Sequence, residues 1–172
     1  MIIAIDLGIK CGWAATRGPY GYIAGVDRID DCCDDLRSIL DALLPLCGPM
    51  DLDFSLLAYE SAAWHQSKAS AELYGRRVGV LETWAALQNP PLRMESVKPS
   101  DVRKAAGVKS RYATKDFEGT PAQRKRQARE AGKAAMVAKA RLRWPDLDVL
   151  DDNVADALWM LEVARQRWPG SV

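Results

Sequence analysis

The sequence predicts a single α/β domain whose mixed five-stranded sheet has three antiparallel strands followed by two parallel strands, with helices on its faces. Two observations predict this class. Three short apolar runs, separated only by turn residues, open the chain as an antiparallel meander would. The later apolar runs alternate with segments of helical period, as in strand–helix–strand units. A length of 172 residues suits one compact domain, so one domain over residues 1–172 is expected.

The first three strands are predicted from their apolar composition and from the turn residues that separate them. Residues 1–7 are mostly Ile, Leu and Ala, which predicts a buried strand with Asp6 at its carboxyl end. Gly8 then permits a sharp turn. Residues 12–16 and 20–29 are the next two strands, separated by a Gly-Pro turn. From Asp30 the apolar residues recur at helical spacing, which predicts a helix that stops at the Pro-rich segment 45–49.

The second half of the chain alternates strands and helices. Residues 53–60 have strand character and end on a second acid, Glu60. The remaining expected elements are a long helix at 68–87, a strand at 91–97, a short helix from Pro99, a polar irregular segment at 107–120, a basic helix at 121–143 and a last helix from Asp151. Three antiparallel strands followed by two helix-linked strands form the ribonuclease-H-like arrangement.

The charge of the chain is strongly segregated although its net value is only +1. Residues 98–144 hold 14 Lys and Arg and 4 Asp and Glu, a balance of +10; the other 10 basic and 19 acidic residues give −9. A dense basic block favours a polyanionic partner, because Lys and Arg displace the counterions condensed on phosphates. A solvated helix face is the equally good alternative on charge alone.

The sequence shows no signal peptide or membrane-spanning apolar run, which predicts a cytoplasmic protein without a membrane partner, in the host bacterial cytoplasm if the chain is phage-encoded. Its four cysteines lack the paired spacing of a zinc site, and His65 is the only histidine. We expect reduced cysteines that pack in the interior.

Four acids remote in the sequence are expected to meet at one edge of the sheet. Asp6 and Glu60 end strands, while Asp152 and Asp156 are four residues apart on one face of the last helix. Clustered carboxylates repel one another, so an ionised cluster needs a cation. Mg²⁺ prefers such hard oxygen ligands, and two ions can promote hydrolysis of a phosphodiester. The set therefore predicts metal-dependent phosphodiester cleavage.

Structural explanations for the same acids remain open. Asp151 and Asp152 could cap the last helix and complement its dipole, which is the commoner role for an isolated pair. Asp6 could cap the turn after its strand. A carboxylate that ends an apolar strand is costly to bury without a partner, which favours the functional interpretation of Asp6.

Several segments in order resemble the RuvC-like Holliday junction resolvases, especially the short phage-borne members. The matching segments are Ile3 to Ala14 (IAIDLGIKCGWA), Leu56 to Glu60 (LLAYE), Ala71 to Gly79 (AELYGRRVG), Val97 to Lys104 (VKPSDVRK), Gly132 to Val137 (GKAAMV) and Asp152 to Leu158 (DNVADAL). The resemblance implies a ribonuclease-H-like fold and a homodimer that resolves four-way DNA junctions in recombination and repair. It also implies Mg²⁺, with two ions in each site, and Mn²⁺ as an expected substitute.

The resemblance assigns roles to individual residues. Asp6, Glu60 and Asp156 become metal ligands. Asn153 stands where the family often has an acid, which places the remaining ligand at Asp152. Lys133 would lie beside the scissile phosphate. Relative to the family pattern, residues 107–132 contain an apparent basic insertion that could grip DNA. The predicted DNA contacts, including this insertion, are Trp64, Arg76, Arg77, Lys109, Arg111, Lys115, Arg124, Lys125, Arg126 and Arg129.

Trp64 and Lys133 also have structural explanations, and the resemblance suggests where a dimer interface would lie. Trp64 would enter the junction and unstack bases, although a core tryptophan is an equally good interpretation. Lys133 could be an ordinary solvent-facing lysine. On the long helix at 68–87, Gly75 and Gly79 would allow close approach of a second backbone, which makes this helix the expected dimer interface.

Three rival functions remain open on the sequence. An ATP-binding module of the actin and heat-shock-chaperone type also has an Asp-Leu-Gly loop after a strand, but it needs two halves and a second phosphate loop. A non-catalytic protein that binds branched DNA would share the basic block. A YqgF-like nuclease would share the acids but prefer RNA.

Overall fold

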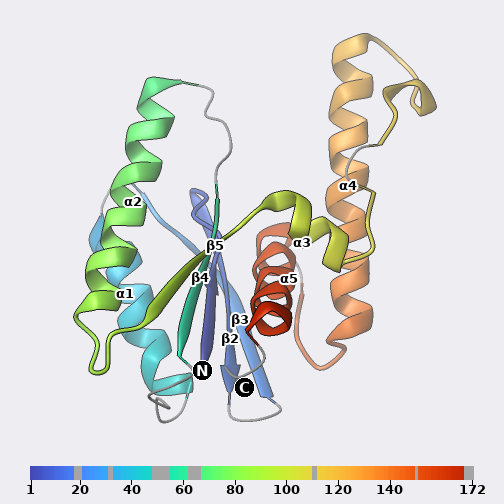
Figure 1. The fold of residues 1–172 in the computed structure, drawn as a ribbon. Helices are drawn as coiled ribbons and strands as arrows, with labels where there is room; N and C mark the ends of the chain where they lie inside the picture. Colours follow the sequence, from blue (N-terminus) through green and yellow to red (C-terminus); the bar gives the residue numbers. More distant parts are fainter. Residues whose placement is uncertain are drawn as a thin grey trace.

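The computed structural model confirms the predicted mixed α/β fold, with the ribonuclease-H-like order of elements (Figure 1). It describes residues 1–17, 21–30, 33–47, 55–61, 67–109, 112–149 and 151–168. The elements are β1 (Ile2–Ile5), β2 (Lys10–Arg17), β3 (Gly21–Arg28), α1 (Cys33–Leu43), η1 (Leu44–Cys47), β4 (Leu56–Glu60), α2 (Lys68–Ala86), β5 (Arg93–Val97), α3 (Pro99–Ala105), η2 (Thr114–Asp116), α4 (Pro121–Arg143) and α5 (Asp152–Arg167).

The five strands form one sheet in the order β3-β2-β1-β4-β5. The first three strands are antiparallel, and β1, β4 and β5 run parallel, as predicted. In the β1–β4 pair, Ile5 lies beside Tyr59. The residues that follow these partners, Asp6 and Glu60, therefore leave the sheet at the same edge.

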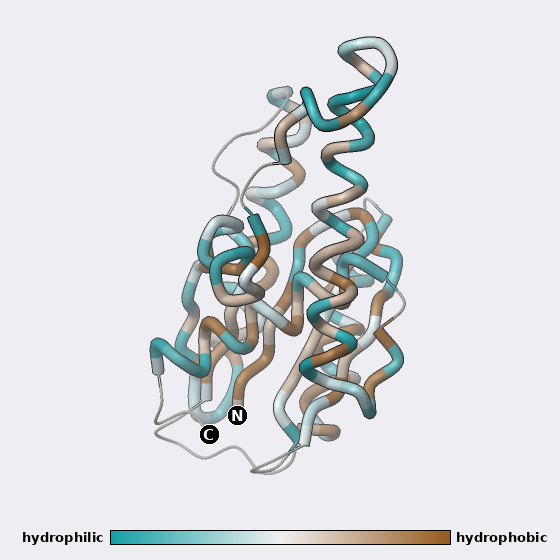
Figure 2. Tube along the Cα trace, turned by 90° about the vertical axis from the view of Figure 1, so that its right-hand side faces the viewer, coloured by the Kyte–Doolittle hydropathy of each residue, from teal (hydrophilic) through white to brown (hydrophobic). Residues whose placement is uncertain are grey.

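Helices cover both faces of the sheet, and the side chains of β1 alternate between them (Figure 1). Ile3 and Ile5 pack with α1 and α2 on one face, whereas Ile2 and Ala4 pack with α5 on the other. α3 and α4 lie against the outer side of α5. Apolar stretches of the chain concentrate in this layered body (Figure 2).

Three helices begin at side-chain caps that the sequence supplies. Ser67 and Ser70 form a reciprocal capping box at α2, and Thr120 with Gln123 does the same at α4. Asp151 caps α5 by accepting a hydrogen bond from the backbone N–H of Asn153 at 2.6 Å. The last helix therefore begins where the sequence predicts it.

The boundaries of some elements differ slightly from the predictions. The second strand begins at Lys10 instead of residue 12, and the first helix begins at Cys33 instead of Asp30. One turn of 3₁₀ helix, η2, lies within the segment that was expected to be irregular. Cys11 and Cys47 are buried and free, as expected for packing cysteines. Within the described ranges, no helix has the length and apolar character needed to cross a bilayer.

Candidate active site

The strand-ending acids meet the first turns of α5 at one edge of the sheet. Asp6 directly follows β1, and Glu60 is the last residue of β4. Both side chains line the same hollow of about 320 Å³. The charges of Glu60, Asp152 and Asp156 all act on Asp6. Asp6 and Glu60 therefore share one hollow, and the other two nominated carboxylates, Asp152 and Asp156, lie within electrostatic range of Asp6.

Gly12 on β2 allows α5 to come this close. A Cβ atom at this position would lie 2.1 Å from the carbonyl oxygen of Asn153, which is far inside van der Waals contact. The carbonyl of Gly12 also accepts a hydrogen bond from the backbone N–H of Asp6 at 2.8 Å. One glycine therefore links the backbone that carries Asp6 to the helix that carries Asp152 and Asp156.

Burial and mutual repulsion shift the carboxylates strongly. Burial, followed by the charges of Glu60 and Asp156, raises the pKa of Asp6 to about 8. Burial, followed by the charges of Glu60 and Asp152, raises the pKa of Asp156 to about 7. Burial also raises the pKa of Glu60, against the attraction of Arg103. Burial is thus the main cause of all three shifts, and repulsion between carboxylates adds to it at Asp6 and Asp156.

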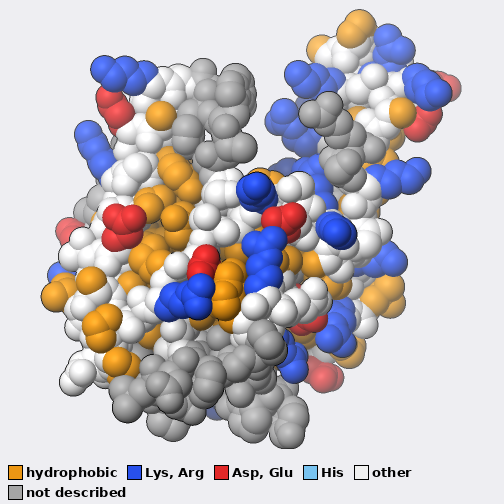
Figure 3. All heavy atoms as spheres, in the orientation of Figure 1, with side chains coloured by type: hydrophobic (Ala, Val, Ile, Leu, Met, Phe, Trp, Pro, Cys, Tyr) orange, Lys and Arg blue, Asp and Glu red, His pale blue; other side chains and the backbone are white. Residues whose placement is uncertain are grey.

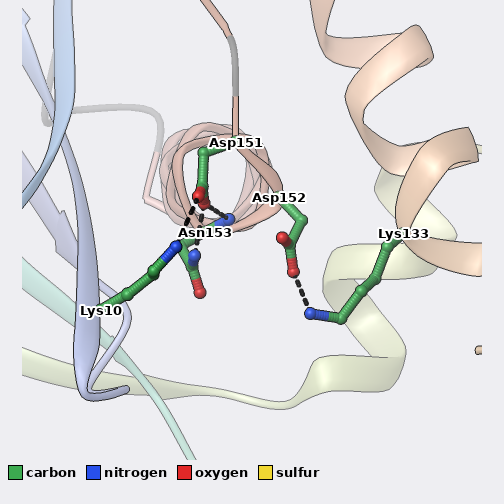
Figure 4. A network of polar contacts seen from close by, with 5 residues as sticks. All are labelled: Lys10, Lys133, Asp151, Asp152 and Asn153. Atoms are coloured by element: carbon green, nitrogen blue, oxygen red, sulfur yellow. Dashed lines mark hydrogen bonds and ion pairs between the residues drawn. The ribbon is translucent and has the colours of Figure 1, made fainter. Parts of the chain in front are cut away.

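Neighbouring residues of the Asp151 to Asn153 turn have different tasks (Figure 4). Asp151 accepts hydrogen bonds from the backbone and side-chain amides of Asn153, and Lys10 lies 3.9 Å from its carboxylate. Asp152 instead points toward α4 and forms an ion pair with Lys133. The capping alternative therefore holds for Asp151, while Asp152 pairs with Lys133 and its charge acts on Asp6 and Asp156.

Lys133 reaches the cluster from α4. Besides pairing with Asp152, its charge lowers the pKa of Asp156. The alternative of a lysine that faces only solvent is thereby excluded, although half of the side chain remains exposed (52%). A cation in this position can meet an anionic substrate.

Arg103 is a second cation at the site, and the sequence analysis assigned it no role. It lies on α3, and its charge lowers the pKa of both Glu60 and Asp156. A topological signal could have identified it. α3 directly follows β5, the strand parallel to β4, so its residues emerge at the edge where Glu60 lies.

Arg77 requires a correction of its predicted DNA contact. Only 5% of this residue is exposed, and its guanidinium donates hydrogen bonds to the carbonyls of Leu7 at 2.8 Å and Ile29 at 3.2 Å. A buried guanidinium that is held by main-chain carbonyls cannot reach a DNA phosphate. Arg77 instead fixes the turn that follows Asp6.

The other predicted DNA contacts fall into three groups. Arg76 is exposed on α2, away from the buried side of that helix. In the 107–132 segment, Arg124 is half-buried, and the other described basic residues of the prediction are exposed: Lys109, Lys115, Lys125, Arg126 and Arg129. Trp64 and Arg111 lie outside the described residues.

The chemistry of the cluster fits a hard divalent cation. The carboxylates of Asp6, Glu60, Asp152 and Asp156 are hard oxygen donors, and a cation would offset the repulsion that helps to raise the pKa of Asp6 and Asp156. No group of three or more His, Cys, Asp or Glu side chains in the described part of the chain is already arranged to hold a metal ion. The argument for a divalent cation therefore depends on the carboxylate oxygens as hard donors and on the raised pKa values of Asp6 and Asp156.

The raised pKa values predict how stability depends on pH without divalent ions. Two carboxyls with an ordinary pKa of 3.8 reach about 8 and about 7 on folding, so between these limits the folded state binds more protons than the unfolded chain. Their contribution to stability is complete below the unfolded pKa and is lost as the pH rises through the folded values. We expect the melting temperature in EDTA to fall between about pH 5 and pH 8.

Circular dichroism melts at fixed ionic strength would measure this dependence. Asp6→Asn, which removes the largest shift, should flatten the profile, and added Mg²⁺ should have the same effect on the unsubstituted protein. A melting temperature that stays constant or rises over this interval in EDTA would contradict this electrostatic description of the cluster.

Fold and site together define a class of protein, a ribonuclease-H-like domain with a carboxylate cluster at the edge of its sheet. No protein-family model matches the chain, and no curated protein sequence matches it. Among the solved structures that are similar to the chain, two RuvC structures match over almost its whole length. RuvC of T. thermophilus in complex with a Holliday junction substrate has a TM-score of 0.64 and 14% identity, covering 99% of this chain and 96% of that one.

A second RuvC structure from Thermus thermophilus has a TM-score of 0.60 and 16% identity, covering 97% of this chain and 96% of that one. At such low identity these likenesses establish a shared fold. The sequence resemblance to the RuvC-like family is therefore supported at the level of the fold.

Proposed function

We propose that this chain is a divalent-metal-dependent endonuclease that cuts branched DNA, and specifically four-way junctions. The observation that carries the proposal is the convergence of Asp6, Glu60 and Asp156 beside the cations of Arg103 and Lys133. Carboxylates alone would repel a phosphodiester, whereas carboxylates that bind metal next to fixed cations can hold one.

The residues that would hold Mg²⁺ are Asp6, Glu60, Asp152 and Asp156, with Mn²⁺ as an expected substitute. Bound ions would supply an activated water and charge for the departing 3′ oxygen. Lys133 and Arg103 would hold the phosphate by charge-assisted hydrogen bonds and stabilise the charge that develops on it. Lys133 would then exchange its contact with Asp152 for one with the phosphate.

The hollow beside Asp6 and Glu60 gives room for a substrate strand. Its walls include the apolar side chains of Leu73 and Tyr74 and the exposed Ile9, 61% of which is accessible. An apolar wall next to carboxylates suits the sugar or base of a nucleotide whose phosphate lies at the acids. A hollow with an apolar wall beside the carboxylates supports the binding of a nucleotide, which a patch of acids on an open surface would not provide.

The preference for a junction is the finer part of the proposal. It is supported by the fold shared with a RuvC that was solved in complex with a Holliday junction substrate. A four-way junction presents equivalent strands in pairs, which suits a two-fold homodimer with one site on each strand. On α2, a Cβ added at Gly75 or Gly79 would meet nothing within 4 Å, so this helix face is open to a second copy.

A cleavage assay tests the proposal directly. End-labelled junction, fork, duplex, single-stranded DNA and an RNA junction are incubated with the protein in Mg²⁺ or EDTA. We expect cutting of the DNA junction in Mg²⁺ only, with incisions at symmetric positions on opposed strands. Binding without incision would identify a binding protein instead, and preferential cutting of RNA would identify an RNA nuclease.

A further inference from the structure

The first half of α4 projects beyond the layered body of the protein (Figure 1, Figure 2). Burial along this helix begins only at Ala128, and Met136 is its first residue in the central core. We call residues 112–130 the projecting arm. A Cβ added at Gly132 would lie 3.7 Å from the ring of Tyr112, so the start of the arm passes close against α4. The start of the arm is therefore packed against α4 at Gly132.

Basic side chains gather on this projection (Figure 3). Lys125, Arg129 and Lys133 are spaced by four residues, so they share one face of α4. Two hollows flank this face. One, of about 580 Å³, is lined by all three residues. The other, of about 760 Å³, is lined by Lys125 and Arg129 together with Arg103. The face thus leads from the tip of the arm to both cations of the candidate active site.

The two outer cations of this face are available to a ligand. Both are exposed, and no carboxylate among the described residues forms an ion pair with Lys125 or Arg129. Their neighbour Arg126 differs, because it is paired with Glu130 at 2.7 Å. Exposed cations in a row that form no ion pair with any described residue favour an extended polyanion as the partner.

We propose that Lys125 and Arg129 hold the phosphate backbone of the duplex DNA arm that leads into the cut site. This inference deepens the proposed function and rests on it, because the track of cations ends at Lys133 and Asp152. From Lys125 to Lys133 the helix rises by about 12 Å, at about 1.5 Å per residue. Measured along the axis of a duplex, that span corresponds to about three to four base-pair steps of about 3.4 Å each. The track would fix the position of the DNA without taking part in the chemistry.

The test compares two double variants of equal charge. Lys125→Gln/Arg129→Gln removes the outer track, and Arg17→Gln/Lys139→Gln removes two exposed cations elsewhere. Arg17 ends β2 at the opposite end of the sheet from Asp6, and Lys139 lies further along α4. Thermal melts establish that both variants fold. Junction binding is then measured in EDTA across a series of salt concentrations.

We expect the track variant to bind about tenfold or more weakly at low salt, with a log–log salt dependence shallower by about two, because two phosphates are no longer neutralised. The matched variant should keep the salt dependence of the unsubstituted protein. Half-maximal single-turnover cleavage in Mg²⁺ should require about tenfold more of the track variant, because its affinity for the junction is lower. Arg129→Lys, which keeps the charge, should retain the full salt dependence.

The outcomes separate this inference from the proposed function. If the unsubstituted protein cuts junctions but the track variant has the salt dependence of its matched control, the track does not bind DNA and only this inference fails. If the unsubstituted protein neither binds nor cuts junctions, the proposed function and this inference fail together. If making the flanking arm single-stranded leaves the defect unchanged, duplex DNA is the wrong partner.

Discussion

Replacing Asp6 by asparagine should abolish cleavage of a four-way junction while the protein continues to bind it. Asp6→Asn keeps the size of the side chain but removes the charge that a divalent cation would need. Asp156→Asn should have the same effect from the other side of the cluster. Because a bound metal contributes several kcal/mol to phosphodiester cleavage, each rate should fall by at least about a thousandfold.

Asp151→Asn provides a matched control for these variants. It removes a carboxylate from the start of the same helix, but Asp151 caps α5, and asparagine caps a helix about as well as aspartate. Single-turnover cleavage and junction binding in EDTA should be measured for all three. Undiminished cutting by Asp6→Asn or Asp156→Asn would remove that residue from the active site, whereas an equal loss in Asp151→Asn would show a general electrostatic effect.

Adding one methyl group at Gly12 should strongly destabilise the fold. In Gly12→Ala the new Cβ would overlap the carbonyl of Asn153 and could be accommodated only if α5 moved away from β2. Because the obstacle is backbone, no change of side-chain rotamer relieves it. We expect a loss of about 3 kcal/mol in the free energy of unfolding. This corresponds to a fall of about 6 to 12 °C in the melting temperature.

Gly132→Ala separates this clash from the general effect of replacing a glycine. Its Cβ would meet the ring of Tyr112 at an ordinary 3.7 Å, within a regular helix. Alanine should therefore leave stability unchanged or raise it by about 0.5–1 kcal/mol. Urea and thermal unfolding give both values. If Gly12→Ala proved as stable as Gly132→Ala, the close approach of α5 to β2 would be wrong.

The sequence allowed much of this architecture to be predicted, because the deciding features are local. Asp6 and Glu60 each end an apolar strand run, and parallel strands deliver their carboxyl ends to one edge. The spacing of Asp152 and Asp156 places both on one face of a helix. These patterns, together with the fold class that the sequence predicts, are sufficient to nominate the acids.

What the sequence left open depends on three-dimensional packing. Arg76 and Arg77 are adjacent on a helix, and a charge pattern cannot tell which of them is buried and bonded to main-chain carbonyls. Arg103 acts on the cluster through the path of β5 and α3, which charge counting does not describe. Asp151 and Asp152 were also interchangeable as helix caps until the orientation of the first turn of α5 separated them.

Two hydrogen bonds hold the chain at the end of β4, and neither of them involves residues 62–66. The hydroxyl of Tyr74 donates a hydrogen bond to the carbonyl of Glu60 at 2.8 Å, and the backbone N–H of Ser61 donates to the carbonyl of Val97 at 2.8 Å. Residues 62–66, which include Trp64, could thus be exchanged for other sequences without displacing the acid before them. Under the proposed function, changes in this segment would alter the choice of DNA substrate and leave the chemical step intact.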